Sequence, residues 1–419
     1  MRRVTPDTLS RHLLGLGIAL LLLVTLQACP RPSATTAPLA GQPDLRIGLE
    51  VDAGRVRIGG QGAVAVVAGG QVATRLTGGS EATLTRDGRD VVLTIGAEAR
   101  RFERISFVSL AQQSFVHVNG AHYRGVVDVY PGDRGLTVVN ELPIEQYLLG
   151  VVNAEMGRRS ASEQAALEAQ AIVARTYALR NRGKFGAEGF DLRSSVADQA
   201  YGGIARETAA GRAAVDGTAG MVLTYRGDLA APFFHSTCGS STAAADEAFR
   251  SVPSRPYLRP VSDRHGDGYY CDISPRFQWS VEWDGETLAR ILRRTVPAIV
   301  GIDGTRVDVV RGVRVHRRGP SGRATELRIE VGSGEIPVFG PDLRAVLETP
   351  DGRPLGSTVF ETEVGLAAGA VSRLTVRGRG WGHGVGMCQW GAVGRARAGQ
   401  SATKIVTTYF PGARLERWY

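Results

Sequence analysis

The stretch LPIEQYLLGVVNAEM, residues 142–156, decides how the centre of this 419-residue chain folds. Its apolar and aromatic residues recur at the spacing of one helical face, and Pro143 suits the first helical position because its missing N–H would be unpaired there anyway. The next position on that face holds Glu155. Desolvating an unpaired carboxylate costs several kcal/mol. Two interpretations stay open: a helix end that turns to solvent, or an acid placed there for chemistry.

A second helix is predicted within SASEQAALEAQAIVARTYALRN, residues 160–181, because Ser160 and Glu163 have the spacing of a capping box. Alanines occur on nearly every side of this helix, which indicates close packing against its neighbours. Gly150 interrupts the first helix at a cost of about 1 kcal/mol relative to alanine. An interior glycine makes sense where another backbone comes close, and we expect the alanine-rich helix to be that partner.

The polar residues of the second helix indicate a groove. Gln170 and Tyr177 share one face, and we expect both to line a groove beside Glu155. Glu163 is explained by capping and Glu168 by an ordinary surface or packing position. Neither is therefore the candidate acid.

The N-terminus predicts export. Arg2 and Arg3 precede LLGLGIALLLLVTL, residues 13–26, an apolar run too short for a permanent membrane span. The run leads to LQAC, which resembles the lipobox of bacterial lipoproteins and implies lipidation of Cys29. We therefore predict a signal peptide over 1–28, a lipidated tether over 29–44, and a membrane-anchored lipoprotein of the cell envelope. An ordinary secreted protein is the alternative.

The formal net charge is +9, and about +7 once the predicted signal peptide with its three arginines and one aspartate is removed. No arginine cluster with interleaved aromatic residues stands out, so we expect no nucleic-acid partner. The charge indicates nonspecific attraction to an anionic cell wall or membrane.

Residues 45–139 predict a small β-rich lobe, because short alternating segments are separated by Gly-Gly and Asp-Gly turns. The strongest hairpin signal is Asn119-Gly120. His117 and His122 flank that turn without further ligands at metal spacing, so we interpret both as structural.

Six motifs in order along the chain are similar to successive signatures of the SpoIID/LytB domain family, the sporulation stage II protein D family: LPIEQYLLGVVNAEM, EAQAIVARTYAL, YGG, FFHSTCGSSTAAADEAF, LGSTVF and GRGWGHGVGMCQWGA. The similarity spans roughly residues 45–419. It implies an α+β fold in which a catalytic domain with the alanine-rich helical pair and β-strands occupies 140–419. Within that domain, residues 284–369 are more divergent and β-rich.

The resemblance also implies a lytic transglycosylase that cuts the MurNAc–GlcNAc glycan strands of peptidoglycan, preferably strands without stem peptides. The family's catalytic glutamate corresponds to Glu155. An apolar flank raises a carboxyl pKa, so such a group can hold a proton near neutral pH. Hydrolysing glycosidases ordinarily use two carboxylates, and the sequence offers one strong candidate. One is sufficient if the C6 hydroxyl of the muramic acid attacks C1 and forms a 1,6-anhydro ring.

The segment GRGWGHGVGMCQWGA has glycine at every second place, which allows another strand or a ligand to come close. No Gly-Lys-Ser/Thr follows, so it is no phosphate loop. Its tryptophans suit sugar rings or a packed core, and its polar side chains suit sugar hydroxyls. Together with positions implied by the family, the predicted substrate contacts are Gln170, Tyr177, Tyr201, His235, Ser236, Trp381, His383 and Gln389.

Beyond Cys29 three cysteines remain, Cys238, Cys271 and Cys388, an odd number for an oxidising compartment. The three thiolates and His235 would make a closed Cys3His structural zinc site. The alternative is a Cys238–Cys271 disulfide with Cys388 as a free thiol, and His265 is a replacement ligand. The glycan chemistry itself requires no cofactor.

Two other functions stay open. LytB-type relatives have been named as enhancers of an autolysin, so the chain could bind glycan and assist a separate cell-wall amidase. A zinc amidase with His235 and His383 as ligands and Glu155 as base is the third hypothesis. A catalytic zinc prefers fewer thiolates and an open position, so three cysteines argue against it.

Overall fold

A computed structural model describes residues 38–111, 114–250 and 252–419, and the predicted signal peptide and Cys29 lie outside this part. The fold is α+β, as predicted from the sequence. Its buried apolar side chains form three separate clusters, one in the N-terminal β lobe, one around α1 and α2, and one within residues 283–376. Among the described residues, no helix has the length and apolar character needed to cross a membrane.

The N-terminal lobe consists of two antiparallel sheets that share one apolar core. The seven-stranded sheet contains, in chain order, β1 (Asp44–Ala53), β3 (Val64–Ala68), β4 (Gln71–Leu76), β8 (Ile105–Ser109), β11 (Val126–Pro131), β12 (Leu136–Pro143) and β13 (Leu192–Arg193). The six-stranded sheet contains β2 (Arg55–Gly60), β5 (Glu81–Asp87), β6 (Asp90–Ile95), β7 (Glu98–Phe102), β9 (Val116–Val118) and β10 (Ala121–Tyr123). The short β13 is an edge strand of the seven-stranded sheet and pairs in parallel with β1, so a segment from the region after residue 140 completes this lobe's sheet.

The predicted hairpin is confirmed. β9 and β10 pair around Asn119 and Gly120, which have positive φ angles of 49° and 85°. A two-residue turn with both residues left-handed matches the twist of its strands. His117 and His122 face each other across this hairpin, and His117 also lies 3.3 Å from Glu81, so both have the structural surroundings that the sequence predicted.

The central part is built on helices. They are α1 (Ile144–Met156), α2 (Gln164–Arg180), α3 (Ala209–Gly217), α4 (Ala245–Ala248), α7 (Gln389–Arg397) and α8 (Ala402–Tyr409), with short 3-10 turns η1 (Ala161–Glu163), η2 (Gly186–Glu188) and η3 (Gly203–Arg206). The strands are β14 (Met221–Tyr225), β15 (Asp228–Leu229), β16 (Phe234–His235), β17 (Arg264–His265), β18 (Gly268–Tyr269), β25 (Met387–Cys388) and β26 (Arg414–Arg417).

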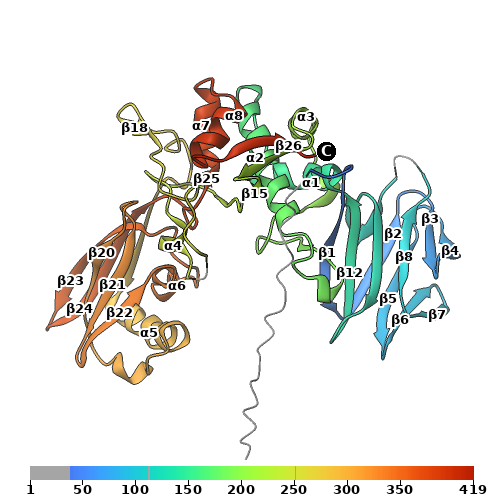
Figure 1. Ribbon diagram of the computed structural model, residues 1–419. Coiled ribbons are helices and arrows are strands. Elements are labelled where there is room, and N and C mark those ends of the chain that lie inside the picture. Colours follow the sequence, from blue (N-terminus) through green and yellow to red (C-terminus); the bar gives the residue numbers. More distant parts are fainter. Residues whose placement is uncertain (1–37, 112–113, 251) are drawn as a thin grey trace, which may run out of the picture. The chain divides into compact units, whose positions relative to one another are not determined.

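Helix α2 is surrounded by α1, α3, α7 and α8 (Figure 1). This explains its alanines, since a helix with neighbours on several sides needs small side chains on several sides. The predicted capping box is present at its start, where the Ser160 backbone N–H donates to the Glu163 carboxylate at 2.9 Å. α7 and α8 come from the far end of the chain, so the C-terminal segment completes the packing of this centre.

The sequence analysis expected the alanine-rich helix, α2, to come close to Gly150, and this prediction is wrong. A Cβ at this position would lie 2.6 Å from Cε2 of Tyr201 and 3.2 Å from the backbone nitrogen of Gly203. The close approach therefore comes from Tyr201 and the start of η3 and not from α2.

Gly150→Ala is expected to destabilise the protein by about 1–3 kcal/mol, because the added methyl overpacks a filled site and outweighs the higher helix propensity of alanine. Urea unfolding measures the change. Gly217→Ala is the matched control, since a Cβ there meets nothing within 4 Å and its φ is not left-handed. An equal gain in stability for both variants would contradict the packing argument.

Residues 278–379 contain a third set of elements. The strands form two three-stranded antiparallel sheets: β19 (Gln278–Asp284), β23 (Val359–Ala367) and β24 (Ala370–Arg379), and β20 (Val310–Arg318), β21 (Ala324–Val331) and β22 (Gly334–Phe339). The helices are α5 (Gly285–Thr295) and α6 (Asp342–Val346), with turns η4 (Val296–Val300) and η5 (Gly304–Arg306). The divergent β-rich segment predicted at 284–369 thus has an apolar core of its own.

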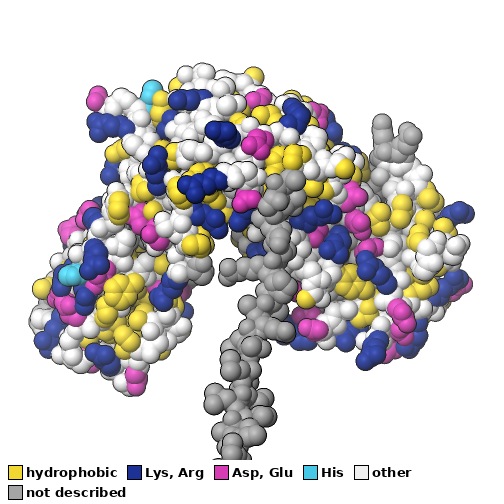
Figure 2. Space-filling view, in the orientation of Figure 1, with side chains coloured by type: hydrophobic (Ala, Val, Ile, Leu, Met, Phe, Trp, Pro, Cys, Tyr) yellow, Lys and Arg dark blue, Asp and Glu magenta, His cyan; other side chains and the backbone are white. Residues whose placement is uncertain are grey.

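Charged side chains of both signs are interspersed on the face shown in Figure 2. Among the described residues, many charged side chains form ion pairs, such as Arg124 with Glu207 and Arg397 with Glu163. The nonspecific attraction of the basic chain to an anionic envelope stays a prediction.

Candidate active site

Glu155 lies in the last turn of α1, at the wall of a cleft of about 470 Å³. The apolar stripe of α1 that precedes it is buried in the central core, whereas the Glu155 side chain is only partly buried. Its Oε1 accepts a hydrogen bond from the backbone N–H of Ala200 at 2.7 Å. The acid therefore faces a cleft. The alternative interpretation, in which the helix end turns to open solvent, does not apply.

Burial raises the pKa of Glu155 above the usual range of a glutamate. The hydrogen bonds from Ala200 and from the Gln389 side chain act in the opposite direction, because they favour the charged form, and burial is the larger effect. A carboxyl group in such surroundings holds its proton at a higher pH than an exposed one. It can serve as a proton donor to a bound molecule.

The raised pKa predicts a pH-dependent stability. The unfolded state ionises Glu155 at its ordinary pKa, so the folded state loses stability as pH rises from that value through the raised one. We expect Glu155→Gln to unfold at higher urea concentration than the native protein at pH 7. The difference should disappear below about pH 4, where both states carry a protonated Glu155. A difference that is constant over this range would contradict the burial argument.

The walls of the cleft are largely aromatic. Tyr177 from α2, Phe233 and Phe234 at β16, Phe249 after α4, and Trp381 line it. The guanidinium of Arg276 covers the Trp381 ring at 4.7 Å from its centroid. Flat apolar faces beside hydrogen-bonding groups suit rings that carry hydroxyls, such as sugars.

The cleft brings together six of the predicted substrate contacts with Glu155: Tyr177, His235, Ser236, Trp381, His383 and Gln389. Their placement in one cavity agrees with the prediction, and their binding roles stay predictions. Trp390 lies elsewhere, beneath the guanidinium of Arg159 at 4.4 Å.

Two predicted contacts do not line the cleft. Gln170 is fully buried, and its Oε1 accepts a hydrogen bond from Nε2 of Gln389 at 3.4 Å. Tyr201 is 6% exposed, and its hydroxyl donates to Oδ1 of Asn140 at 2.8 Å. Helical spacing placed Gln170 on the correct side of α2, but Gln389 covers it. Tyr201 fills the space above Gly150 instead.

The two histidines of the cleft are neutral donors or acceptors at neutral pH. Nδ1 of His235 donates to the carbonyl of Val385 at 3.2 Å, and Nε2 has no hydrogen-bond partner among the described residues. His383 donates from Nε2 to the carbonyl of Phe234 at 2.9 Å and accepts at Nδ1 from the Val385 N–H. Burial lowers the pKa of His235 well below its usual value and that of His383 to about 4. His235 thus presents a free acceptor nitrogen.

Asp198 is a cleft residue that the sequence reasoning missed. It lies in an irregular segment with no motif around it, so only the fold could place it here. Its Oδ1 accepts from the Tyr177 hydroxyl at 2.9 Å and pairs with Lys184, and its Oδ2 accepts from the Arg193 N–H at 2.9 Å. This second carboxylate is already engaged and holds Tyr177 in position.

The alternating glycines of the last motif allow two chain segments to meet. A Cβ on Gly386 would lie 2.1 Å from the carbonyl oxygen of Phe233, and one on Gly380 would lie 2.7 Å from that of Thr237. Both glycines have positive φ angles. The motif can therefore run beside residues 233–238, where β25 pairs in parallel with β16 and places His383 and Gln389 beside His235.

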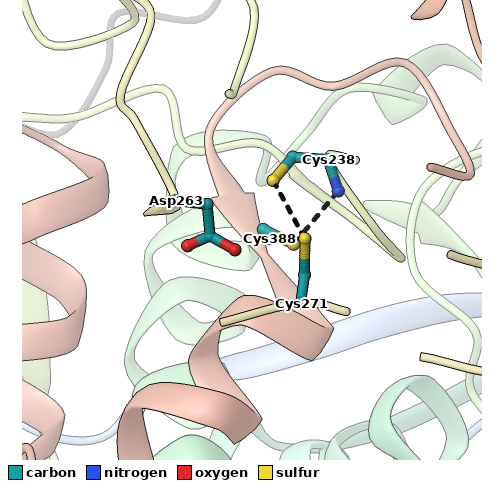
Figure 3. A group of neighbouring side chains, drawn as sticks. All are labelled: Cys238, Asp263, Cys271 and Cys388. Atoms are coloured by element: carbon teal, nitrogen blue, oxygen red, sulfur yellow. Dashed lines mark hydrogen bonds between the residues drawn. The ribbon is translucent and has the colours of Figure 1, made fainter. Parts of the chain in front are cut away.

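The three described cysteines are buried free thiols that converge with Asp263 (Figure 3). The potential ligand atoms of these four residues all lie within 4.8 Å of one another. His235, the predicted fourth ligand, is not in this group, and it lines the cleft instead. His265 is also outside it, on the exposed hairpin β17–β18, where it stacks on Tyr270.

Comparisons with known proteins show what parts of the chain are similar to. The profile of a family described as Stage II sporulation protein, SpoIID, matches residues 132–225, which include Glu155 and Tyr177. A second profile, described as a domain of unknown function (DUF8618), matches residues 258–386. That second match coincides largely with the third set of elements and its separate core.

Three relatives each match more than half of the chain. An uncharacterized protein of Brachyspira hyodysenteriae is 30% identical over 302 residues, 71% of this chain and 73% of the relative. The Amidase enhancer of Bacillus subtilis is 28% identical over 295 residues, 64% of this chain and 40% of the relative. Stage II sporulation protein D of Bacillus amyloliquefaciens is 27% identical over 303 residues, 66% of this chain and 75% of the relative.

Proposed function

The chain belongs to the SpoIID family, and from that premise we propose that it is a lytic transglycosylase acting on the glycan strands of peptidoglycan. The observation that carries the proposal is Glu155, a partly buried acid with a raised pKa at the wall of an aromatic cleft. The preferred substrate is a MurNAc–GlcNAc strand without stem peptides, and the reaction leaves a 1,6-anhydroMurNAc end.

In this mechanism, protonated Glu155 donates its proton to the glycosidic oxygen as the bond from that oxygen to C1 of MurNAc breaks. The C6 hydroxyl of the same MurNAc attacks C1, and the Glu155 carboxylate accepts the hydroxyl proton. The acid returns to its starting form and no water is consumed. Acid–base help of this kind contributes about 10²- to 10⁴-fold in rate.

The state of the second carboxylate favours this reaction over hydrolysis. Asp198 lines the same cleft, but Tyr177, Lys184 and the Arg193 N–H occupy it. A carboxylate held this way is a poor base for water, whereas a hydrolase needs two working carboxyl groups. An attacking hydroxyl within the substrate removes that need.

The remaining cleft residues have proposed binding roles. Trp381 offers an apolar face to a sugar ring, and Nε2 of His235 offers a buried acceptor to a hydroxyl or to an acetamido N–H. Gln389 donates to Gln170 on one side and contacts Glu155 on the other. It therefore orients the acid as well as lining the cleft.

The alternative is a noncatalytic protein that binds glycan and assists a cell-wall amidase, which the name of the Bacillus subtilis relative favours. A zinc amidase using His235 and His383 is a weaker alternative, because both ring nitrogens of His383 are already hydrogen-bonded. In either case the protein acts outside the cytoplasm, held by a lipid at Cys29.

Mass spectrometry of digested strands tests the proposal. Purified protein is incubated with glycan strands stripped of stem peptides, in isotopically labelled water. We expect new ends that are lighter than hydrolytic ends by one water and contain no labelled oxygen. Labelled reducing ends would indicate a hydrolase. No cleavage of these strands, together with faster amide cleavage by an added amidase on peptidoglycan that keeps its stem peptides, would indicate the enhancer and overturn the proposal.

A further inference from the structure

We propose that Cys238, Asp263, Cys271 and Cys388 form a closed structural zinc site of the Cys3Asp type, which holds together the segments that carry the cleft residues. The four side chains point toward one another from separate segments of the chain (Figure 3). This assignment does not depend on the proposed reaction.

The distances suit one tetrahedral ion. With Zn–S bonds of about 2.3 Å, two sulfurs of a tetrahedral site lie about 3.8 Å apart. Sγ of Cys238 lies 3.5 Å from Sγ of Cys271, too far for a disulfide and close to the separation that zinc imposes. All four residues are fully buried, so the site has no open position for water or substrate. That is the property of a structural zinc and not of a catalytic one.

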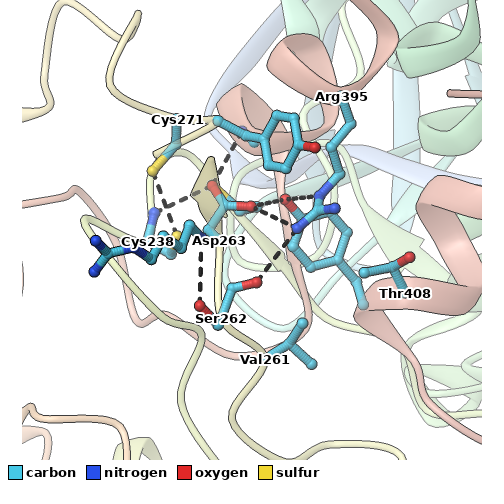
Figure 4. Close-up of polar contacts among 12 residues, drawn as sticks. Cys238, Val261, Ser262, Asp263, Cys271, Arg395 and Thr408 are labelled. Carbon is cyan, nitrogen blue, oxygen red and sulfur yellow. Dashed lines mark hydrogen bonds and ion pairs between the residues drawn. The ribbon is translucent and has the colours of Figure 1, made fainter. Parts of the chain in front are cut away.

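Asp263 has one oxygen free for the ion. Its Oδ1 accepts from the Tyr409 hydroxyl at 2.6 Å and from Nη2 of Arg395 at 3.2 Å (Figure 4). Its Oδ2 is buried and has no hydrogen-bond partner among the described residues. Leaving a buried carboxylate oxygen unpaired is costly. A metal bond to Oδ2 accounts for it, and the partners of Oδ1 then orient the ligand.

The charges around the group also indicate an ion. Zinc with three thiolates and one carboxylate carries a net charge of −2. Arg395 pairs with Asp263, and Arg323 is 1% exposed with its Nη2 donating to the carbonyl of Cys238 at 2.7 Å. Arg323 forms no ion pair within the described part of the chain, and its Nε and Nη1 lack partners there. Two buried guanidinium groups would balance the charge of the proposed site, whereas three neutral thiols leave Arg323 uncompensated.

Backbone groups are arranged for a thiolate at Cys388. The N–H groups of Cys238 and Gly391 both lie 3.2 Å from its Sγ. Gly391 can approach this way only without a side chain, since a Cβ there would lie 2.1 Å from the Tyr409 hydroxyl oxygen. Glycine at position 391 thus allows the backbone N–H to reach the sulfur of Cys388.

Two of the proposed ligands are neighbours of cleft residues in the chain. Cys238 follows Ser236 by two residues, and Cys388 precedes Gln389 directly. An ion bound by all four residues would link the segments of Cys238 and Cys388 to the segment that carries Asp263 and Cys271. The zinc would therefore fix Gln389 against Glu155 without entering the reaction.

Metal analysis of the full chain purified without chelator tests the assignment, with zinc and thiols counted per chain. We expect one zinc per chain. Cys388→Ser should lose it, and Asp263→Asn should lower retained zinc in dialysis against a competing chelator. His235→Gln should keep it, because His235 is not a ligand.

Replacement of zinc by cobalt is measured on the native sequence. Its result therefore does not depend on whether the variants fold. We expect the strong near-ultraviolet absorption of thiolate-to-cobalt charge transfer. The proposal would be overturned by a mass lower by two hydrogens with no zinc, which indicates the Cys238–Cys271 disulfide, or by three reactive thiols that take up neither metal. Loss of zinc in His235→Gln would restore the Cys3His ligand set and also contradict it.

Discussion

Glu155→Gln lowers the rate of 1,6-anhydro product release about 10²- to 10⁴-fold, while affinity for glycan strands stays within a few-fold of the native protein. The amide keeps the shape and can still accept the 2.7 Å hydrogen bond from Ala200, but it has no proton to give and none to take back. Product release is measured by mass spectrometry and affinity by co-sedimentation with insoluble peptidoglycan. The two readings together separate loss of chemistry from loss of binding.

Glu168→Gln is the matched control for this result. Glu168 is a half-buried acid on α2 whose pKa is also raised by burial, but it does not line the cleft. Its replacement is expected to leave product release unchanged. If the two variants behave alike, or if Glu155→Gln retains native turnover, Glu155 is not the acid.

The second large effect is on stability. Glu145→Gln is expected to lower the free energy of unfolding by about 3–5 kcal/mol, because it removes the charged partner of a buried guanidinium. Arg175 is fully buried, and its Nε and Nη2 donate to the two oxygens of Glu145 at 2.8 and 2.7 Å. Glu145 also accepts from the Tyr419 hydroxyl at 2.6 Å, so it joins α1 and α2 to the C-terminus. Urea unfolding followed by circular dichroism measures the loss.

Glu363→Gln provides the comparison on the surface. Its partner is Arg377, and the two side chains are 61% and 64% exposed. Solvent screens such a pair, so the unfolding midpoint is expected to stay unchanged. Equal losses from both variants would show that burial does not set the strength of these ion pairs.

Local signals in the sequence were sufficient for several elements. The capping box at Ser160 and Glu163 and the turn at Asn119-Gly120 depend on neighbours within a few residues, and the structure has both. The apolar stripe of α1 predicted both the helix and the unusual position of Glu155. The alanines of α2 predicted close packing, although they did not say with which neighbours.

The errors came from contacts between residues far apart in the chain. Gly150 meets Tyr201 and Gly203 rather than α2, which removes Tyr201 from the cleft. Gln389 covers Gln170 from more than two hundred residues away. His235 was the nearest histidine to Cys238 in sequence, but Asp263 is the residue whose side chain reaches the thiols.

The amino-acid sequence by itself determined the family, the α+β class, the first two helices and the identity of the candidate acid, because each depends on short-range spacing or on residue type. Only the tertiary structure decided which side chains share a cavity with Glu155, that Asp198 is already engaged, and that a carboxylate completes the cysteine cluster. These depend on how segments more than a hundred residues apart pack together, and packing is a property of the whole core and not of any one segment.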